Sequence, residues 1–183
     1  LADEVLFTLD HVAPIREDDE YGGFRVSLLA RFETIQTPLK IDVTTGDVIT
    51  PEAVCYSFPS AFEDKRIEVW AYNLETILAE KIETILRRSV FNTRPRDFYD
   101  VFILTKTYRQ SIDQNVLKTA LNATAQRRMS LDALKNSNAI VRTIQADSTM
   151  RARWDRYCRE YYFASGISFD ELVGILHAVL QDE

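Results

Sequence analysis

The sequence has 183 residues, of which 46% are hydrophobic and 27% are charged, and its formal net charge is -6. This composition is typical of a globular protein with enough apolar material for a core, and it argues against a surface that binds polyanions over its whole extent. No apolar run approaches the roughly 20 residues of a membrane span, and Cys55 and Cys158 fit no metal-ligand spacing, so we expect a cytoplasmic protein with free thiols.

The first 72 residues predict an antiparallel sheet. Alternating apolar and polar residues, or β-branched runs closed by turn residues, indicate strands in four segments: 4–12, 24–35, 39–45 and 66–72. The polar, glycine-ended segment 16–23 joins the first two strands as a hairpin loop. Segment 49–65 contains Pro51, Pro59 and several polar residues, and we predict irregular structure there.

From residue 73 onwards the pattern becomes helical. Apolar residues recur at helical spacing in about six segments: 74–88, 95–108, 111–128, 130–145, 149–164 and 168–181. Asn73 is a predicted N-cap, and Ser111 and Ser168 each stand three residues before a Gln or Glu, in the register of a capping box. We therefore predict an α+β protein with a small antiparallel, β-rich region at 1–72 and a helical bundle at 73–183.

Lys81 interrupts the apolar face of the first predicted helix. On a helical wheel it falls between Leu74 and Ile77, inside the apolar stripe. A lysine in this position either lays its methylenes over the core with its ammonium in water, or is buried against an opposite charge. The position of Lys81 in the centre of the stripe, and not at its margin, favours burial. A buried ammonium needs a nearby carboxylate as counter-charge, or it must lose its proton.

Two places in the sequence can supply that carboxylate. Asp97 and Asp100 occupy neighbouring positions on one face of the next helix, although both acids could instead complement the helix dipole. Asp42 lies inside a predicted strand, where the alternative is a solvated outer face. If Asp42, Lys81 and Asp97 converge, they form a site for a phosphorylated ligand and its Mg²⁺, since Mg²⁺ prefers carboxylate oxygens and lysine is a point charge for phosphate.

Arginines alternate with aromatic residues in the stretch "RWDRYCREYYF" at 153–163. This composition could stack on RNA bases or neutralise RNA phosphates. An amphipathic helix also buries aromatic side chains for packing alone, and we favour that interpretation. The sequence contains no Walker A loop, dinucleotide-binding glycine motif, zinc-ligand spacing or nucleophile elbow.

The two helices that carry Lys81 and the paired aspartates resemble those of the AbiEii-type nucleotidyltransferase family, the toxin half of type IV toxin–antitoxin pairs. The resemblance covers residues 38–104 and rests on three motifs. These are Leu74, Glu75, Leu78, Ala79, Glu80 and Lys81 on the first helix, Arg96, Asp97 and Asp100 on the second, and the strand "KIDVTTGDVITP" with Asp42.

The resemblance implies a nucleotidyltransferase-like core that uses Mg²⁺ to transfer a nucleotide from an NTP to RNA such as tRNA, and a cognate antitoxin as partner. It implies that Lys81 contacts phosphate or transfers a proton and that Asp97, accompanied by Asp100, orients Lys81 or the substrate. It further implies that Asp42 helps to activate the acceptor hydroxyl. Lys40 and Arg96 are the candidate substrate-binding residues beside these acids.

The sequence departs from the family pattern at its beginning. The family opens with a Gly-Gly-Ser/Thr helix start and an Asp-x-Asp pair, whereas here Gly22-Gly23 precedes Phe24 and Asp18-Asp19 lies in the predicted hairpin loop. We therefore expect the chain to be the C-terminal part of a longer enzyme and to be inactive alone. The alternative is a degenerate, non-catalytic module that binds protein or RNA.

Overall fold

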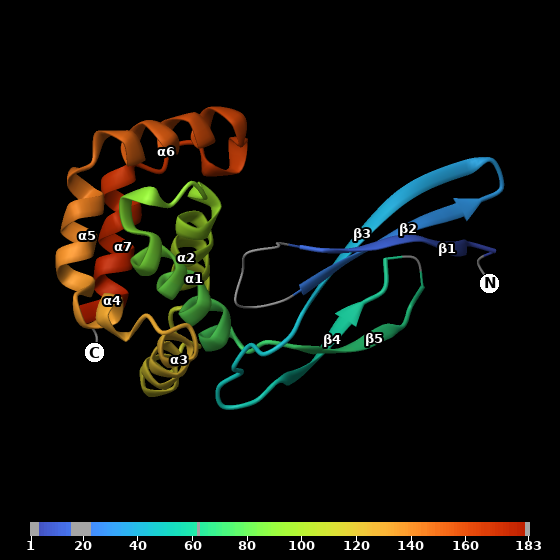
Figure 1. The fold of residues 1–183 in the computed structure, drawn as a ribbon, viewed down its shortest axis with the longest axis horizontal. Coiled ribbons are helices and arrows are strands. Elements are labelled where there is room, and N and C mark those ends of the chain that lie inside the picture. Colours follow the sequence, from blue (N-terminus) through green and yellow to red (C-terminus); the bar gives the residue numbers. More distant parts are fainter. Residues whose placement is uncertain (1–3, 16–22, 62, 182–183) are drawn as a thin grey trace. The chain divides into compact units, whose positions relative to one another are not determined.

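The structure, a computed structural model, describes residues 4–15, 23–61 and 63–181 (Figure 1). The chain divides into two compact units, Leu1–Asp47 and Val48–Glu183. The first unit contains one sheet, and the second contains a smaller sheet together with all the described helices. Most of the predicted hairpin loop at 16–23, including Asp18-Asp19 and Gly22, lies outside the described residues.

The first unit is a three-stranded antiparallel sheet with the order β1-β2-β3, as the alternation predicted. Its strands are β1 (Leu6–Pro14), β2 (Gly23–Phe32) and β3 (Ile35–Thr44). The register places Phe24 opposite Val43 and Arg25 opposite Asp42. Because successive side chains point to opposite faces, one face of the β2–β3 pair is largely apolar and the other carries the charged residues.

The smaller sheet pairs β4 (Val54–Pro59) with β5 (Arg66–Ala71) in antiparallel orientation. The prediction of irregular structure throughout 49–65 was therefore wrong. Pro51 and Pro59 stand before and at the end of β4, so neither removes a donor from the middle of the strand. Between the prolines, Val54, Tyr56 and Phe58 repeat with the two-residue period of a strand.

The described residues form seven α-helices and two 3₁₀ helices, which confirms the α+β class. They are α1 (Leu74–Arg88), η1 (Ser89–Phe91), α2 (Pro95–Tyr108), α3 (Gln114–Arg127), α4 (Leu131–Lys135), α5 (Ser137–Ala146), α6 (Ser148–Glu160), η2 (Tyr162–Ala164) and α7 (Phe169–Gln181). The predicted helix at 130–145 is two helices, since the chain leaves helical geometry at Asn136. None of the described helices is long and apolar enough to cross a membrane.

Side-chain caps fix where several helices begin. Asn73 Oδ1 accepts a hydrogen bond from Thr76 N (2.8 Å), and Ser168 Oγ accepts one from Glu171 N (3.1 Å), so both predicted caps are confirmed. The predicted cap at Ser111 was wrong. Helix α3 begins at Gln114, and Asp113 Oδ1 caps it by accepting hydrogen bonds from Asn115 N and Val116 N.

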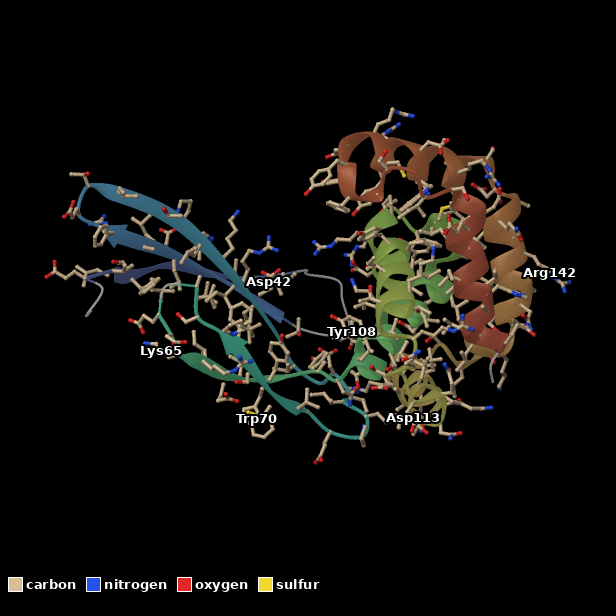
Figure 2. The ribbon with its side chains drawn as sticks, turned by 180° about the vertical axis from the view of Figure 1, so that it is seen from behind. Asp42, Lys65, Trp70, Tyr108, Asp113 and Arg142 are labelled. Carbon is tan, nitrogen blue, oxygen red and sulfur yellow. The ribbon has the colours of Figure 1, made fainter. Side chains whose placement is uncertain are left out.

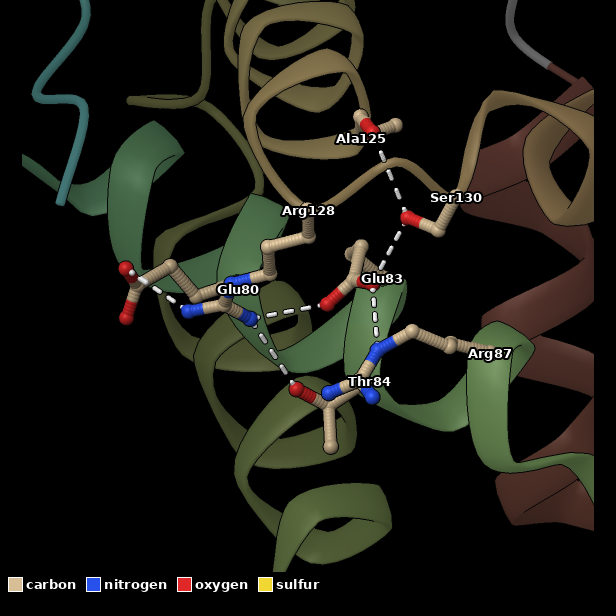
Figure 3. Close-up of polar contacts among 7 residues, drawn as sticks. All are labelled: Glu80, Glu83, Thr84, Arg87, Ala125, Arg128 and Ser130. Carbon is tan, nitrogen blue, oxygen red and sulfur yellow. Dashed lines mark hydrogen bonds and ion pairs between the residues drawn. The ribbon is translucent and has the colours of Figure 1, made fainter. Parts of the chain in front are cut away.

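The helices enclose the core. Every buried apolar side chain of the described residues lies between Leu78 and Leu180. Three acidic residues of the helices, Glu75, Glu83 and Asp97, are also buried. Of these, Glu83, at 3% exposure, holds α1 against the segment that links α3 to α4 (Figure 3). Glu83 accepts hydrogen bonds from Arg87 (2.9 Å), Arg128 (2.8 Å) and Ser130 (2.7 Å). A buried carboxylate with this many donors is compensated in charge and in hydrogen bonding.

Candidate functional site

Lys81 lies where the apolar stripe of α1 faces α2. Its neighbours Leu78, Ile82 and Ile85 are fully buried, while the Lys81 side chain is 31% exposed. The Nζ atom is 2.9 Å from Asp97 Oδ1 and 2.9 Å from Asp100 Oδ2. The structure thus brings Lys81, Asp97 and Asp100 together, and we call these three residues the triad.

The start of α2 positions both acids of the triad. Pro95 occupies the first turn, where its missing N–H costs no helical hydrogen bond. Asp97 and Asp100 follow three residues apart, and their side chains are 7% and 22% exposed. If Asp97 only complemented the dipole of α2, its side chain would have no reason to be buried. Its burial against Lys81 favours the ion-pair interpretation.

The triad keeps Lys81 protonated. Burial on its own lowers the pKa of Lys81, but hydrogen bonds and charge from Asp100 and Asp97 outweigh it, so the pKa rises above its ordinary value. A protonated ammonium can contact a phosphate or donate a proton, but it cannot accept one. The raised pKa is therefore compatible with phosphate contact and with proton donation, and it disfavours a role for Lys81 as a general base.

This raised pKa predicts a stability change at alkaline pH. A lysine whose pKa is higher in the folded than in the unfolded state stabilises the fold while it is protonated. This stabilisation is complete at a pH below the unfolded-state pKa of 10.5, and it is lost as the pH rises through the folded-state pKa. The difference in unfolding free energy between the unmodified chain and Lys81→Met should therefore stay constant from about pH 6 to 9 and shrink above the ordinary lysine value. Urea denaturation of both proteins across this range measures it. A decrease in this free-energy difference centred near neutral pH would contradict the raised pKa of Lys81.

One oxygen of Asp97 has no partner among the described residues. Asp97 Oδ2 is buried and unbonded, although buried carboxylate oxygens normally accept hydrogen bonds. The Lys81 ammonium binds both acids of the triad, and the described residues contain no group of three His, Cys, Asp or Glu side chains that could hold a metal. In the triad, the positive charge beside the two carboxylates is therefore the Lys81 ammonium.

Asp42 lies on β3, in the first compact unit (Figure 2), and Lys40 lies on the same strand. Arg25 donates to both Asp42 oxygens, at 2.7 and 2.8 Å. These hydrogen bonds hold the pKa of Asp42 below its usual value, and the charges of Arg25 and Lys40 add to the effect. Asp42 is therefore a weak base in this arrangement. Its convergence with Lys81 and Asp97, which lie in the second unit, stays a prediction.

A cleft of about 640 Å³ opens beside the triad, within the second unit. One wall consists of α1 and the start of α2, through Lys81, Thr93, Arg94, Pro95, Arg96 and Asp97. The other wall is the end of α6 and the residue after it, through Arg153, Arg156, Tyr157, Glu160 and Tyr161. Five lining side chains are cationic and two are acidic, so the cleft is basic although the whole chain is acidic. Its size is in the range of small-molecule binding sites.

The arginines of the cleft differ in the hydrogen bonds and ion pairs that they make with the rest of the protein. Arg153 Nη1 donates to the backbone oxygens of Val90 (3.1 Å) and Asn92 (3.2 Å), so this guanidinium helps to hold α6 in place. Arg96 is 79% exposed and lies 3.9 Å from Asp100. Among the described residues, Arg94 and Arg156 have no ion-pair partner. These last three arginines are therefore available to an anionic ligand.

Arg96 was predicted as a site residue, but the wall that α6 provides was not predicted. Arg153, Arg156, Tyr157, Glu160 and Tyr161 follow one another at intervals of one, three or four residues, which places them along one side of a helix. This spacing was the available signal. It was overlooked because Trp154, from the same stretch, is buried at 2% exposure and fits the packing interpretation that we favoured.

The fold and the site define an α+β protein with a basic cleft beside a lysine–carboxylate triad. Residues 1–174 match the family model described as nucleotidyl transferase AbiEii toxin, type IV TA system. The chain therefore belongs to this family of nucleotidyltransferase toxins.

Two crystal structures from Helicobacter pylori, those of a candidate nucleotidyltransferase and of JHP933, are similar to the chain. Each aligns over 96% of this chain with 17% sequence identity and a TM-score of 0.39. The chain spans 65% of the length of the first and 63% of the second. The comparison with curated proteins found no match.

Proposed function

We propose that the chain is the part of a nucleotidyltransferase toxin that holds the triphosphate and positions the reacting groups. The enzyme transfers a nucleotide from an NTP to an RNA acceptor, such as tRNA, and a cognate antitoxin restrains it. The observation that carries this proposal is the Lys81 ammonium, 2.9 Å from two carboxylates and on the wall of a basic cleft.

The donors of Lys81 support a phosphate contact. An ammonium has three N–H donors, and Asp97 and Asp100 accept two of them. The third donor remains for a phosphate oxygen on the exposed side of Lys81. Asp97 and Asp100 are then positioning residues, because they fix the ammonium before the ligand arrives, and such preorganisation is how charged groups stabilise a transition state.

In the proposed reaction the acceptor hydroxyl oxygen forms a bond to the α-phosphorus of the NTP. The bond between that phosphorus and the oxygen bridging to the β-phosphorus breaks, and pyrophosphate leaves with the electron pair. Lys81 stabilises negative charge on the phosphate oxygens, Arg96 contributes a second positive charge, and Lys40 is a further substrate contact. Asp42 accepts a hydrogen bond from the hydroxyl and orients it, and the hydroxyl proton passes to solvent water as the new bond forms. Mg²⁺ belongs to this proposal as a cofactor of the family's chemistry.

Incorporation of label from α-³²P-labelled NTPs into RNA tests the proposed function. We expect labelled RNA with the protein expressed from its complete reading frame and none with the 183-residue chain alone, because this sequence contains neither Gly-Gly-Ser/Thr nor Asp-x-Asp. Each of the four NTPs is tried separately against total RNA and purified tRNA. If the complete protein labels no RNA but still binds it, the non-catalytic binding module replaces the enzyme.

A further inference from the structure

We infer that the α6 wall of the cleft is a nucleotide-binding platform, with a base stacked on Tyr161 and its phosphate contacted by Arg94, Arg96 and Arg156. This inference rests on the proposed function, whose site it extends. The ligand is a nucleotide unit, carried either by the incoming NTP or by the end of a single-stranded RNA. The reaction described above requires both to come close to the triad.

Tyr161 is held in place by other aromatic rings. Its ring centroid is 4.6 Å from that of Tyr157 and 5.4 Å from that of Phe163. Tyr157 in turn stacks on Trp154 at 5.5 Å, and the Trp154 indole donates to Ile167 O (2.8 Å). Tyr161 thus packs against rings that are connected to the helical core through Trp154. A ring fixed before binding loses little conformational entropy when a base stacks on it.

The supported ring still has surface available for a ligand. Tyr161 is 38% exposed and lines the cleft together with Tyr157. A tyrosine that is fully buried for packing alone would be neither exposed nor part of the lining of a cleft. Base–aromatic stacking tolerates any base, because every base has a π-face. The platform can therefore bind a nucleotide without choosing its identity.

The platform and the triad belong to one site. Burial raises the pKa of the Tyr157 hydroxyl, and the charge of Asp100 raises it further, so the aromatic rings lie within electrostatic reach of the triad. Arg96, one of the available cations, extends from the same turn of α2 as Asp97. A nucleotide with its base on Tyr161 therefore has guanidinium groups and the Lys81 ammonium around its phosphates, all on the walls of one cleft.

Neighbouring residues provide matched controls. Tyr162 follows Tyr161 in the chain and is 90% exposed, but it does not line the cleft. Arg159 lies on α6 like Arg156 and is also exposed, but it does not line the cleft either. Replacing Tyr161 or Tyr162 removes the same kind of side chain at nearly the same place in the sequence, and the same holds for Arg156 and Arg159. A difference in binding within either pair therefore reports on the cleft.

Equilibrium binding tests the platform without requiring catalysis. The probes are the four NTPs and a fluorescein-labelled single-stranded RNA of about 12 nucleotides, a length within the range that stacking sites cover. We expect Tyr161→Ala to weaken binding about 5- to 100-fold, Tyr161→Phe to retain it, and Tyr162→Ala to leave it unchanged. Arg156→Ala should lower the salt dependence of RNA binding by about one released ion, and Arg159→Ala should not. Circular dichroism confirms that each variant is folded.

The pattern of losses assigns the source of the nucleotide. Weaker NTP binding in Tyr161→Ala places the base of the incoming nucleotide on the platform, and weaker RNA binding alone places an acceptor base there. The inference is overturned if the unmodified chain binds neither probe, if Tyr161→Ala and Tyr162→Ala behave alike, or if Tyr161→Phe binds as weakly as Tyr161→Ala. If binding depends on Tyr161 but the complete protein transfers no nucleotide, the proposed function is contradicted and the platform stands. If the complete protein transfers nucleotide but binding does not depend on Tyr161, the platform is contradicted and the proposed function stands.

Discussion

Lys81→Met, in the protein expressed from its complete reading frame, is expected to lower the rate of nucleotide transfer about 100- to 1,000-fold, the usual effect of removing one preorganised charge from a transition-state site. Methionine keeps the length and the apolar stem of lysine, so the packing of α1 is retained. Single-turnover transfer of labelled nucleotide to RNA measures the rate, because it reports the chemical step without product release. Ground-state binding of the NTP should weaken much less.

Two companion variants separate catalysis from structure. Lys106→Met removes a lysine of α2 that pairs with Glu171 (2.6 Å) away from the cleft, and it should leave the rate unchanged. Lys81→Met leaves the buried charge of Asp97 without its partner and should cost about 1–3 kcal/mol of stability. Adding Asp97→Asn restores the charge balance, so the double variant should regain stability but not transfer. Full activity of folded Lys81→Met would remove Lys81 from the mechanism.

The triad could be predicted because its signal is local. Lys81 and the core residues around it lie on one helix, and a lysine in the middle of an apolar stripe needs a counter-charge. The next helix along the chain offers Asp97, buried by its alignment with apolar positions. Adjacent helices joined by a short connection are usually neighbours in space, so sequence order alone suggested the pair.

The cleft could not be predicted in the same way, because its two walls are distant in sequence. Tyr161 reaches the cleft only because α6 contacts α2, after α3, α4 and α5 have intervened. The stretch around Tyr161 is compatible with burial, RNA contact or both, and only its packing partners decide between them. Strand β4 was missed for a different reason, since Pro51 and Pro59 resemble breakers until the pairing with β5 shows that they flank the strand.

The buried network around Glu83 was also invisible in the sequence. Arg128 lies 45 residues after Glu83, and nothing in the intervening pattern indicates that they meet. Glu83 follows Lys81 by two residues, about 200° around the helix, so α1 carries opposite charges on nearly opposite sides. Lys81 faces the acids of α2, and Glu83 faces the donors Arg128 and Ser130. Helix α1 is thereby fixed from both sides, which is the condition for a precisely placed ammonium.

Glu83→Ala is therefore expected to destabilise the chain by about 3–5 kcal/mol, the usual cost of removing one partner from a buried ion pair. The loss leaves Arg128, whose side chain is 18% exposed, with only the hydroxyl of Thr84 and the more exposed carboxylate of Glu80 among the contacts drawn in Figure 3. Glu83→Gln keeps the shape and should cost less. Glu80→Ala, on the same helix but 23% exposed, should cost about 1 kcal/mol or less. Urea denaturation measures all three, and equal losses for Glu83→Ala and Glu80→Ala would contradict the central position of Glu83 in the network.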